Sequence, residues 1–314
     1  PDGLVIRRVR TPIGVIACIF ESRPNIIIDV AALCLKSGNA LIVRGGKEAA
    51  HSNNAFMALI KQAITTAGLP EYAVQQLEDR RYEAINELVQ LEDYLDLVIP
   101  RGREELIRAV SAHAHVPVIK HVRGLCHAYI DEGADIEKAI KITVNAKTSN
   151  PATCNTIETL LVHQKVAATV LPRLLDELIK RGVEIRGDAR TCTYNQACRA
   201  ATEEDWSTEY LDLILAVKVV DSFEEALKHI VHYSSQLTDS IITENKQRAD
   251  EFVKRIDSAT VLINASNRLT DGGEFGLGGE IGISTARIHM RGPMGLEDLT
   301  VTKYLVVGNG HIRQ

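Results

Sequence analysis

Residues 12–43 read PIGVIACIFESRPNIIIDVAALCLKSGNALIV. The apolar run at 12–20 is short and rich in β-branched residues, which predicts a buried strand. A helix is predicted to begin after Asn25, which can cap its first turn, and to end at Gly38, which can adopt a left-handed conformation. A second apolar strand follows at 40–43. A strand, a helix and a strand in this order indicate a parallel sheet covered by helices.

The same alternation of short apolar runs and amphipathic stretches continues along the chain and restarts after Asp131. The segment 271–282 holds six glycines in twelve residues, which predicts a loop. We therefore predict an α/β protein with two domains and a boundary near 125–135. Further strands are predicted at 94–99, 156–162, 216–220, 240–243 and 260–263.

The composition excludes several classes of function. The chain has 314 residues, and 36 Lys and Arg against 41 Asp and Glu give a net charge of −5. Without a run of five basic residues it has no electrostatic footprint for nucleic acid. The longest apolar stretch, 13–20, is far shorter than the about 20 residues that span a bilayer, and no secretory signal is found. We predict a cytoplasmic protein that binds neither nucleic acid nor a membrane.

Metal and nucleotide motifs are missing. None of the six cysteines forms a CxxC pair or a Cys/His cluster with zinc spacing, so no metal site is predicted. The motifs GxGxxG, GxxxxGK[ST], GxSxG and HExxH are absent. A chain of this size can form a core without disulfides, which favours a reducing compartment. Cys192 and Cys198, beside a polar stretch, are predicted to be free surface thiols.

Cys154 is the strongest candidate for chemistry. It lies in NAKTSNPATCNTIETLLVH (145–163), in a polar turn directly before a predicted strand. A thiol in such a turn can be partly exposed and close to backbone N–H groups, conditions that favour a nucleophilic thiolate. From these residues alone, a buried and unreactive cysteine is the alternative. Cys18 and Cys34 lie within apolar elements and are predicted to be core residues.

The segment around Cys154 closely resembles the catalytic-cysteine segment of the γ-glutamyl phosphate reductases, or glutamate-5-semialdehyde dehydrogenases, of the aldehyde dehydrogenase superfamily. Other blocks resemble the same family, in the same order, over nearly the whole chain. They are PIGVIACIFESRPN (12–25), CLKSGNALIVRGGKEA (34–49), LVIPRG (97–102), GLCHAYID (124–131), EYLDLILAVKVV (209–220) and INASNRLTDGGEFGLGGEIGISTARIHMRGPMGLEDLTVTKY (263–304).

The resemblance implies an aldehyde-dehydrogenase-like α/β fold, with two domains of parallel-rich sheets and a short oligomerisation hairpin. It divides the chain into a cofactor-binding domain at 1–125, a catalytic domain at 126–290 and a return and oligomerisation segment at 291–314. The implied reaction is the NADPH-dependent reduction of γ-glutamyl phosphate to glutamate 5-semialdehyde and phosphate, in proline biosynthesis. Cys154 would form a thioester, which divides one difficult reduction into two easier steps. The implied partners are this small substrate, a glutamate 5-kinase and further copies of the chain.

The resemblance also implies positions for NADPH. Lys47 stands where NAD-dependent relatives have a carboxylate for the ribose hydroxyls, and it follows Arg44 and Gly46. Two cations here would favour the 2′-phosphate of NADP. For Lys47 a solvated surface position is the alternative.

Two further cofactor contacts follow from the resemblance. Arg101 and Gly102 match the superfamily's pyrophosphate turn, where the N–H groups of a helix face the anion. Glu209 matches a glutamate that holds the nicotinamide ribose, with an ordinary surface charge as the alternative.

The substrate's carboxylate and ammonium groups need polar partners. Arg23, Ser266, Arg268 and Thr270 lie in segments that resemble the surroundings of the family's active site. Arg268 ranks first because an arginine fork matches a carboxylate. For each of the four, a purely structural role is the alternative.

The sequence departs from the family at several points. Family members usually carry a further N-terminal segment that does not precede Pro1 here. Leu237 stands where the family typically has a histidine, so a substrate or proton-transfer role of that histidine does not carry over. The family also lacks the general-base glutamate of aldehyde-oxidising relatives, and His121 and His127 are the candidates to replace it. GLGGE (276–280) replaces the more common GLGAE. Three interpretations stay open: a separate reductase, the reductase module of a bifunctional kinase–reductase, and an inactive truncated remnant. A CoA-acylating aldehyde dehydrogenase is disfavoured by the IPRG and RGPMGL blocks.

Overall fold

The computed structural model describes residues 3–120 and 123–313, which form two compact units. Unit 1 comprises Pro1–Lys120, Gly276–Gly282 and Ala286–Gln314, and unit 2 comprises His121–Phe275 and Ile283–Thr285. These ranges differ from the division at 125 and 290 that the resemblance implies. The chain returns to unit 1 within the glycine-rich loop, where Ile281 joins the apolar core of that unit.

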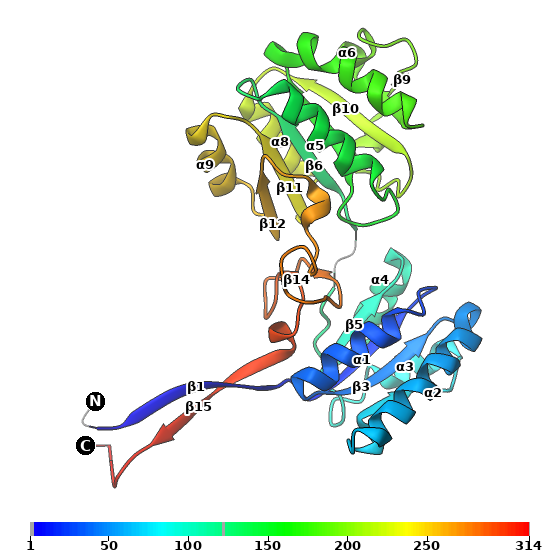
Figure 1. The fold of residues 1–314 in the computed structure, drawn as a ribbon, viewed down its shortest axis with the longest axis vertical. Coiled ribbons are helices and arrows are strands. Elements are labelled where there is room, and N and C mark those ends of the chain that lie inside the picture. Colours follow the sequence, from blue (N-terminus) through cyan, green and yellow to red (C-terminus); the bar gives the residue numbers. More distant parts are fainter. Residues whose placement is uncertain (1–2, 121–122, 314) are drawn as a thin grey trace. The chain divides into compact units, whose positions relative to one another are not determined.

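The sheet of unit 1 has four parallel strands in the order β4-β3-β2-β5. One apolar cluster packs α1 and α2 against one face, and another packs α3 and α4 against the opposite face (Figure 1). The strands are β2 (Val15–Phe20), β3 (Ala40–Gly45), β4 (Val74–Gln76) and β5 (Leu97–Arg101). The helices are α1 (Ile26–Ser37), α2 (Ala50–Thr66), α3 (Tyr82–Leu88) and α4 (Glu104–His113), with 3₁₀ turns η1 (Lys47–Ala49) and η2 (Glu71–Ala73).

The ends of α1 show how far local sequence sets a helix. Gly38 has a φ of 82° and its N–H bonds to carbonyls of the last turn, which confirms the predicted stop. Asn25 lies at the predicted N-cap position, but its side chain makes no capping bond. Its amide donates instead to the Asp29 carboxylate at 3.3 Å, so the predicted cap interaction is wrong.

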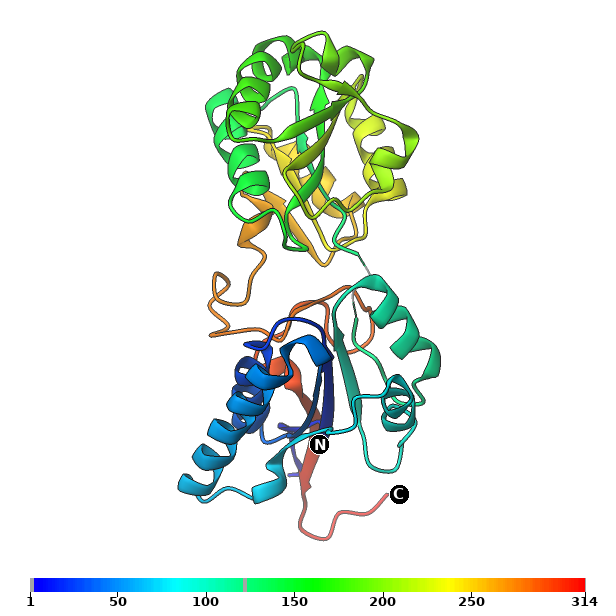
Figure 2. The same ribbon diagram turned by 90° about the vertical axis from the view of Figure 1, so that its right-hand side faces the viewer.

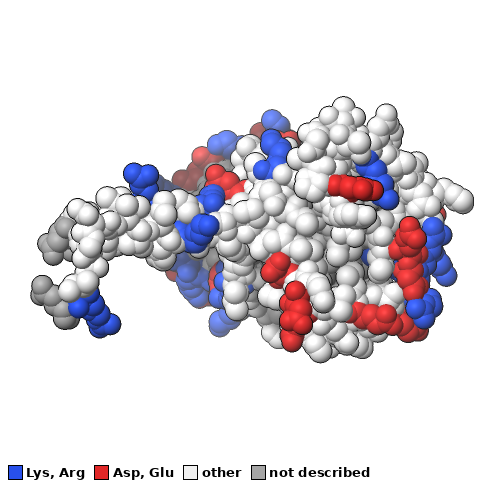
Figure 3. Space-filling model, turned by 90° about the horizontal axis from the view of Figure 1, so that it is seen from below, with Lys and Arg blue, Asp and Glu red and all other residues white. Residues whose placement is uncertain are grey.

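A two-stranded antiparallel ribbon extends from unit 1 (Figure 1). It pairs β1 (Val5–Pro12) with β15 (Thr300–Val307), from Val5 opposite Val307 to Pro12 opposite Thr300. Neither strand contains Asp or Glu, and the ribbon shows isolated basic residues among uncharged atoms (Figure 3). The short strand β14 (Gly292–Pro293) and the turn η5 (Glu297–Leu299) precede it.

Unit 2 is built on seven parallel strands in the order β12-β11-β6-β7-β10-β8-β9, with helices on both faces (Figure 2). One core packs α5 and α6 on the sheet, and another packs α8 and α9. The strands of this sheet are β6 (Cys126–Ile130), β7 (Ile157–His163), β8 (Glu184–Gly187), β9 (Arg199–Ala200), β10 (Ile214–Val220), β11 (Thr238–Ile242) and β12 (Thr260–Ile263). The short strand β13 (Ile283–Ser284) also belongs to unit 2 but lies outside this sheet. The helices are α5 (Ile136–Thr148), α6 (Gln164–Lys180), α7 (Ala189–Cys192), α8 (Phe223–Tyr233) and α9 (Lys246–Arg255), with turns η3 (Glu203–Ser207) and η4 (Asn267–Leu269).

The cysteines differ from expectation at one place. Cys192 and Cys198 form a disulfide, so the prediction of free thiols at these positions is wrong. They are six positions apart in the sequence, and the turn after α7 brings the two side chains together. Cys18 and Cys34 are free and buried, as predicted.

Within the described ranges, no helix has the length and apolar character needed to cross a membrane. Among the same residues, no group of three or more His, Cys, Asp or Glu side chains is arranged to hold a metal ion.

Candidate active site

Cys154 lies on a loop between helix α5 and the buried strand β7. Hydrogen bonds within the loop fix its shape, because the hydroxyls of Thr153 and Thr156 both donate to the carbonyl of Asn150, at 2.9 and 2.6 Å. Every residue of β7 is buried, so the loop ends on a rigid support. Cys154 itself is half-buried. This placement leaves the thiol within reach of a small molecule.

Gly124 packs directly against the backbone of Cys154. A Cβ at Gly124 would lie 2.2 Å from the Cys154 carbonyl oxygen and 2.6 Å from its Cα, so only glycine fits. At the start of strand β6, two residues after Gly124, the Cys126 thiol donates to the Cys154 carbonyl at 3.3 Å. Burial raises the pKa of Cys126 well above its usual range, which leaves that thiol protonated and unreactive.

Three of the four predicted substrate-binding residues come together beside the nucleophile's loop. The guanidinium of Arg268 donates to the Asn155 side chain, and its Nε donates to the Ser149 hydroxyl at 3.2 Å. The Asn155 amide donates to the Thr270 carbonyl at 2.8 Å. The Ser266 hydroxyl accepts from the Arg268 backbone N–H at 3.3 Å. Because Asn155 directly follows Cys154, the cluster ties Arg268 to the loop that carries the thiol.

Glu209 is linked to the Cys154 loop through Gly124, although the three residues lie far apart in the sequence. Its Oε1 accepts from the backbone N–H of Gly124 at 2.9 Å, and Gly124 in turn contacts Cys154. The prediction that Glu209 contacts a cofactor ribose stays a prediction. Glu209, Gly124 and Cys154 all belong to unit 2, so the contact that places Glu209 beside the nucleophile lies within one unit.

Sequence reasoning missed the connecting residues of this site. Gly124, Asn155 and Ser149 hold the candidate residues together, yet none was singled out. Asn155 could have been found from its position directly after the nucleophile. The closeness of Gly124 to Cys154 depends on tertiary packing, and no local pattern reports it.

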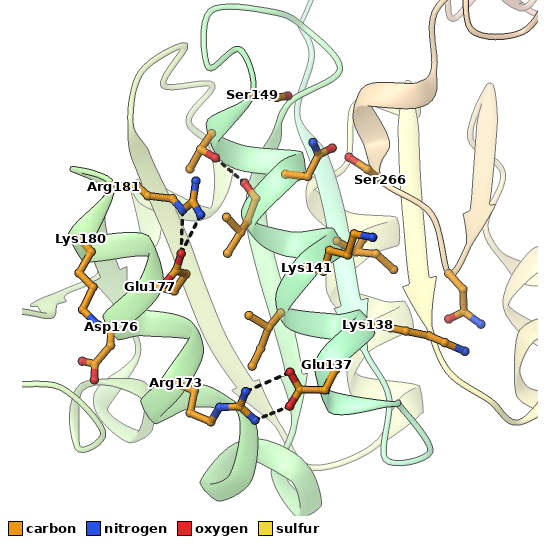
Figure 4. Close-up of a pocket in the computed structure, with 16 residues that line it drawn as sticks. Glu137, Lys138, Lys141, Ser149, Arg173, Asp176, Glu177, Lys180, Arg181 and Ser266 are labelled. Carbon is orange, nitrogen blue, oxygen red and sulfur yellow. Dashed lines mark hydrogen bonds and ion pairs between the residues drawn. The ribbon is translucent and has the colours of Figure 1, made fainter.

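A groove on unit 2 runs between α5 and α6 (Figure 4). Both arginines that line it are engaged in ion pairs, Arg173 with Glu137 at 2.6 Å and Arg181 with Glu177 at 2.7 Å. Ser149 and Ser266 also line the groove, and both bond to Arg268. The Arg268 cluster therefore borders this groove.

In unit 1, the predicted cofactor residues lie at the end of strand β3, with Arg44 inside the strand and Gly46 and Lys47 just after it. The Arg44 guanidinium donates to the Arg80 carbonyl at 2.9 Å. Burial lowers the pKa of Arg44. Gly46 is buried and Lys47 is exposed. Glu48 folds back over Gly46, and its carboxylate accepts from both the N–H and the hydroxyl of Ser22, at 3.0 and 2.8 Å. The Lys47 ammonium thus faces solvent, where an anion could bind it.

The second predicted cofactor segment joins β5 to α4. Arg101 ends β5, and its guanidinium packs against Gly282, where a Cβ would lie 2.2 Å from Nη1. At the N-terminus of α4, the backbone N–H of Arg103 donates to the Glu21 carboxylate at 2.9 Å. A Cβ at Gly102 would lie 2.5 Å from the same carboxylate. This helix end therefore binds an anionic side chain, and its contact with a pyrophosphate stays a prediction.

The remaining candidates are placed differently. Arg23 is exposed and belongs to unit 1, whereas the other three substrate candidates belong to unit 2. His127 is fully buried and packs edge-on against the ring of His229, which removes it from contact with a substrate. His121 lies outside the described residues. Leu237 is buried in the small cluster against which Cys154 packs, so this position has a packing role.

The sequence and the fold of this chain are similar to those of known proteins. Residues 2–192 match the aldehyde dehydrogenase family. The γ-glutamyl phosphate reductase of Moorella thermoacetica is 54% identical over all of this chain and 75% of that protein, and that of Ruthia magnifica subsp. Calyptogena magnifica is 51% identical over 100% and 75%. The crystal structure of γ-glutamyl phosphate reductase from Thermotoga maritima matches with a TM-score of 0.96 and 49% identity, over 100% of this chain and 76% of that one. An acetylating aldehyde dehydrogenase from Geobacillus thermoglucosidasius shares the fold, with a TM-score of 0.78 and 18% identity over 98% and 78% of the two chains.

Proposed function

This chain belongs to the γ-glutamyl phosphate reductases of the aldehyde dehydrogenase family, and we propose that it reduces γ-glutamyl phosphate to glutamate 5-semialdehyde and phosphate, with NADPH as reductant, in proline biosynthesis. The observation that carries the proposal is a half-buried thiol, Cys154, on a loop anchored to an arginine, within a chain whose full length matches reductases of this activity. The acyl phosphate would come from a glutamate 5-kinase.

In the first step the Cys154 thiolate attacks the acyl carbon of the substrate. A carbon–sulfur bond forms, the bond from carbon to the phosphate oxygen breaks, and phosphate leaves with the bonding electrons. No activated water is needed, because phosphate is already a good leaving group. The resulting thioester has a reactive carbonyl. NADPH, when bound, would supply the hydride that reduces this carbonyl. The aldehyde is released when the carbon–sulfur bond breaks and Cys154 regains its thiolate.

Residues around Cys154 would stabilise the charge that develops on the acyl oxygen. Backbone N–H groups of the loop are the natural donors for that oxygen, because they are held in place before the reaction begins. The bonds of Thr153 and Thr156 to Asn150 and the close packing of Gly124 keep the loop in one conformation.

The phosphate-dependent reverse reaction tests the proposal directly. Glutamate 5-semialdehyde, inorganic phosphate and NADP⁺ are supplied, and NADPH absorbance is followed. We expect turnover that requires phosphate. Absence of turnover in a correctly folded chain would contradict the proposal.

Two arginines of unit 1 fit an anionic cofactor. The Nε atoms of Arg44 and Arg101 are buried and have no hydrogen-bond partner among the described residues. A buried guanidinium N–H without a partner is costly, and a phosphate oxygen would satisfy it. We propose that Arg44 and Lys47 hold the 2′-phosphate of NADPH, Arg101 and the turn at Gly102 hold the pyrophosphate, and Glu209 holds the nicotinamide ribose.

Lys47→Glu is predicted to reverse part of the cofactor preference. The ratio of kcat/KM for NADPH to that for NADH should fall by about tenfold to a hundredfold, since a hydrogen bond to a charged group contributes about 1.5–3 kcal/mol. Steady-state kinetics with the two cofactors measure this ratio. Lys36→Glu, another exposed lysine of unit 1, is the control and should keep the parent ratio. An unchanged ratio in Lys47→Glu would refute the assignment.

We propose that Arg268 binds the α-carboxylate of the substrate, since its cluster joins the nucleophile's loop to the groove of unit 2. Arg268→Gln is predicted to raise the KM for glutamate 5-semialdehyde by about tenfold to a hundredfold, the loss of a charge-assisted bond, with little change in the KM for NADP⁺. Arg173→Gln, in the same groove but paired with Glu137, is the control. Equal effects on both KM values would indicate a structural role for Arg268.

We also propose that the chain forms homo-oligomers through the β1–β15 ribbon. Ile6, Tyr304 and Val306 share one face of the ribbon and are 53%, 69% and 54% exposed, and an isolated two-stranded ribbon with an apolar face is marginal in water. A Tyr304→Glu/Val306→Glu variant is predicted to lower the molecular mass measured by light scattering. Lys36→Glu, at an exposed position of helix α1 outside the ribbon, should keep the parent mass. A parent that is already monomeric would refute the proposal.

A further inference from the structure

Lys147 and Glu158 form an ion pair inside unit 2. Lys147 lies in the last turn of α5 and Glu158 lies on β7. Their side chains are 0% and 1% exposed, and Nζ lies 2.6 Å from Oε2. Such a pair is weak evidence for stability, because two charges lose their hydration and well-packed apolar residues often do as well. A fixed geometry is what the pair provides.

The pair closes the base of the loop that carries Cys154. Lys147 precedes this loop and Glu158 follows it, so the ion pair joins the two chain segments from which the loop emerges. The loop is further braced by the Thr156 hydroxyl, which donates to the Asn150 carbonyl at 2.6 Å.

The second oxygen of Glu158 reaches a different part of the chain. Its Oε1 accepts from the backbone N–H of Leu211 at 3.2 Å, and Leu211 has a φ of 53°, which is unusual for this residue type. The neighbouring Tyr210 has its ring 5.9 Å from the Lys147 ammonium and donates its hydroxyl to Asp205 at 2.8 Å. Consecutive residues of the segment 209–211 are therefore held in place, with Glu209 bonded to Gly124.

We infer that Glu158 is a positioning residue: its carboxyl group, held beside Lys147 at the base of the Cys154 loop, accepts from the Leu211 N–H and so holds the segment 209–211 in place and presents Glu209 beside the nucleophile. The inference rests on the proposed function, in which Glu209 contacts the nicotinamide ribose. Gly124 links Glu209 to the nucleophile, because its N–H donates to the Glu209 carboxylate and it packs directly on the Cys154 backbone.

The protonation of the pair guides the choice of variants. Burial raises the pKa of Glu158 to about 7, against the opposing effect of Lys147, and burial lowers the pKa of Lys147. Replacing both partners by neutral residues leaves no unpaired charge in the interior, whereas removing only one of them would be strongly destabilising. An amide oxygen can still accept from the Leu211 N–H, whereas a leucine cannot.

Two double variants test the inference. Lys147→Met/Glu158→Gln removes both charges and keeps an acceptor for Leu211. Lys147→Met/Glu158→Leu removes the charges and the acceptor. We compare their thermal unfolding, the KM for NADP⁺ and kcat in the reverse reaction, and hydrogen exchange of the peptide that contains 209–211.

The glutamine variant is expected to keep a KM for NADP⁺ within about twofold of the parent and slow exchange at 209–211. The leucine variant is expected to raise this KM by about tenfold, the size of effect that a small displacement of a positioned group can produce, with faster exchange and an unchanged KM for glutamate 5-semialdehyde. Equal behaviour of the two variants in exchange would overturn the inference.

Glu209→Gln separates this inference from the proposed function. If Glu209→Gln leaves the KM for NADP⁺ unchanged, the ribose contact is refuted, while hydrogen exchange still decides whether Glu158 holds the segment 209–211. If Glu209→Gln raises the KM but both double variants exchange like the parent, the ribose contact stands and the positioning role is refuted.

Discussion

Cys154→Ser is expected to lower phosphate-dependent NADPH formation by about 10⁴-fold or more, the scale on which enzymes lose activity without their nucleophile. A serine hydroxyl is far less acidic than a thiol, and it would need a partner base to attack an acyl carbon. The substitution changes one atom on a loop that the structure holds through other residues. The folded structure should therefore be retained while turnover is lost.

A second measurement ties this loss to the thioester. Parent protein mixed with γ-glutamyl phosphate in the absence of NADPH should gain the mass of a γ-glutamyl group, and peptide mapping should place it on Cys154. Cys18→Ala is the control, because burial raises the pKa of Cys18 to about 12 and makes its thiol inert. It should keep parent activity and acylation. Parent-like turnover in Cys154→Ser would refute covalent catalysis at this position.

Strands of the two parallel sheets could be predicted where a local apolar run marks them, whereas no strand was predicted at β4, β6, β8 or β9. β2 is apolar throughout, and β3, β7, β10 and β12 each contain an apolar run of three or four residues, as buried parallel strands require. The antiparallel ribbon could not be derived from local pattern, since Val5 pairs with Val307 across almost the whole chain. The short helix α3 was also missed, because its seven residues hold too few apolar positions to show a period.

The site divides in the same way. Cys154 stood out because its polar turn and the following strand are adjacent in sequence. Arg268 was singled out by resemblance, yet its bonds to Asn155 and Ser149 span more than a hundred residues. The disulfide of Cys192 and Cys198 was missed because spacing alone does not report whether a turn brings two side chains together. Contacts of this kind depend on how the sheet of unit 2 is assembled.

Gly124→Ala is expected to lower kcat by about a hundredfold, since a displacement of about 1 Å at a reacting group can have that effect. The new methyl group would lie 2.2 Å from the Cys154 carbonyl oxygen and 2.6 Å from its Cα, and these are backbone atoms that cannot rotate away. Either Cys154 or the segment before β6 must move. Movement of that segment would also disturb the bond from the Gly124 N–H to Glu209, so the KM for NADP⁺ should rise as well.

The control for this prediction is Gly279→Ala, where a Cβ meets no atom within 4 Å. Gly279 stands where the family commonly has alanine, so parent activity is expected. Overpacking costs about 1–3 kcal/mol, and thermal unfolding of Gly124→Ala therefore has to be measured beside its kinetics. A variant that is destabilised but fully active would show that the Cys154 loop can shift without penalty. A variant that keeps most of its stability and loses turnover would show that close packing of Gly124 on Cys154 sets the position of the nucleophile.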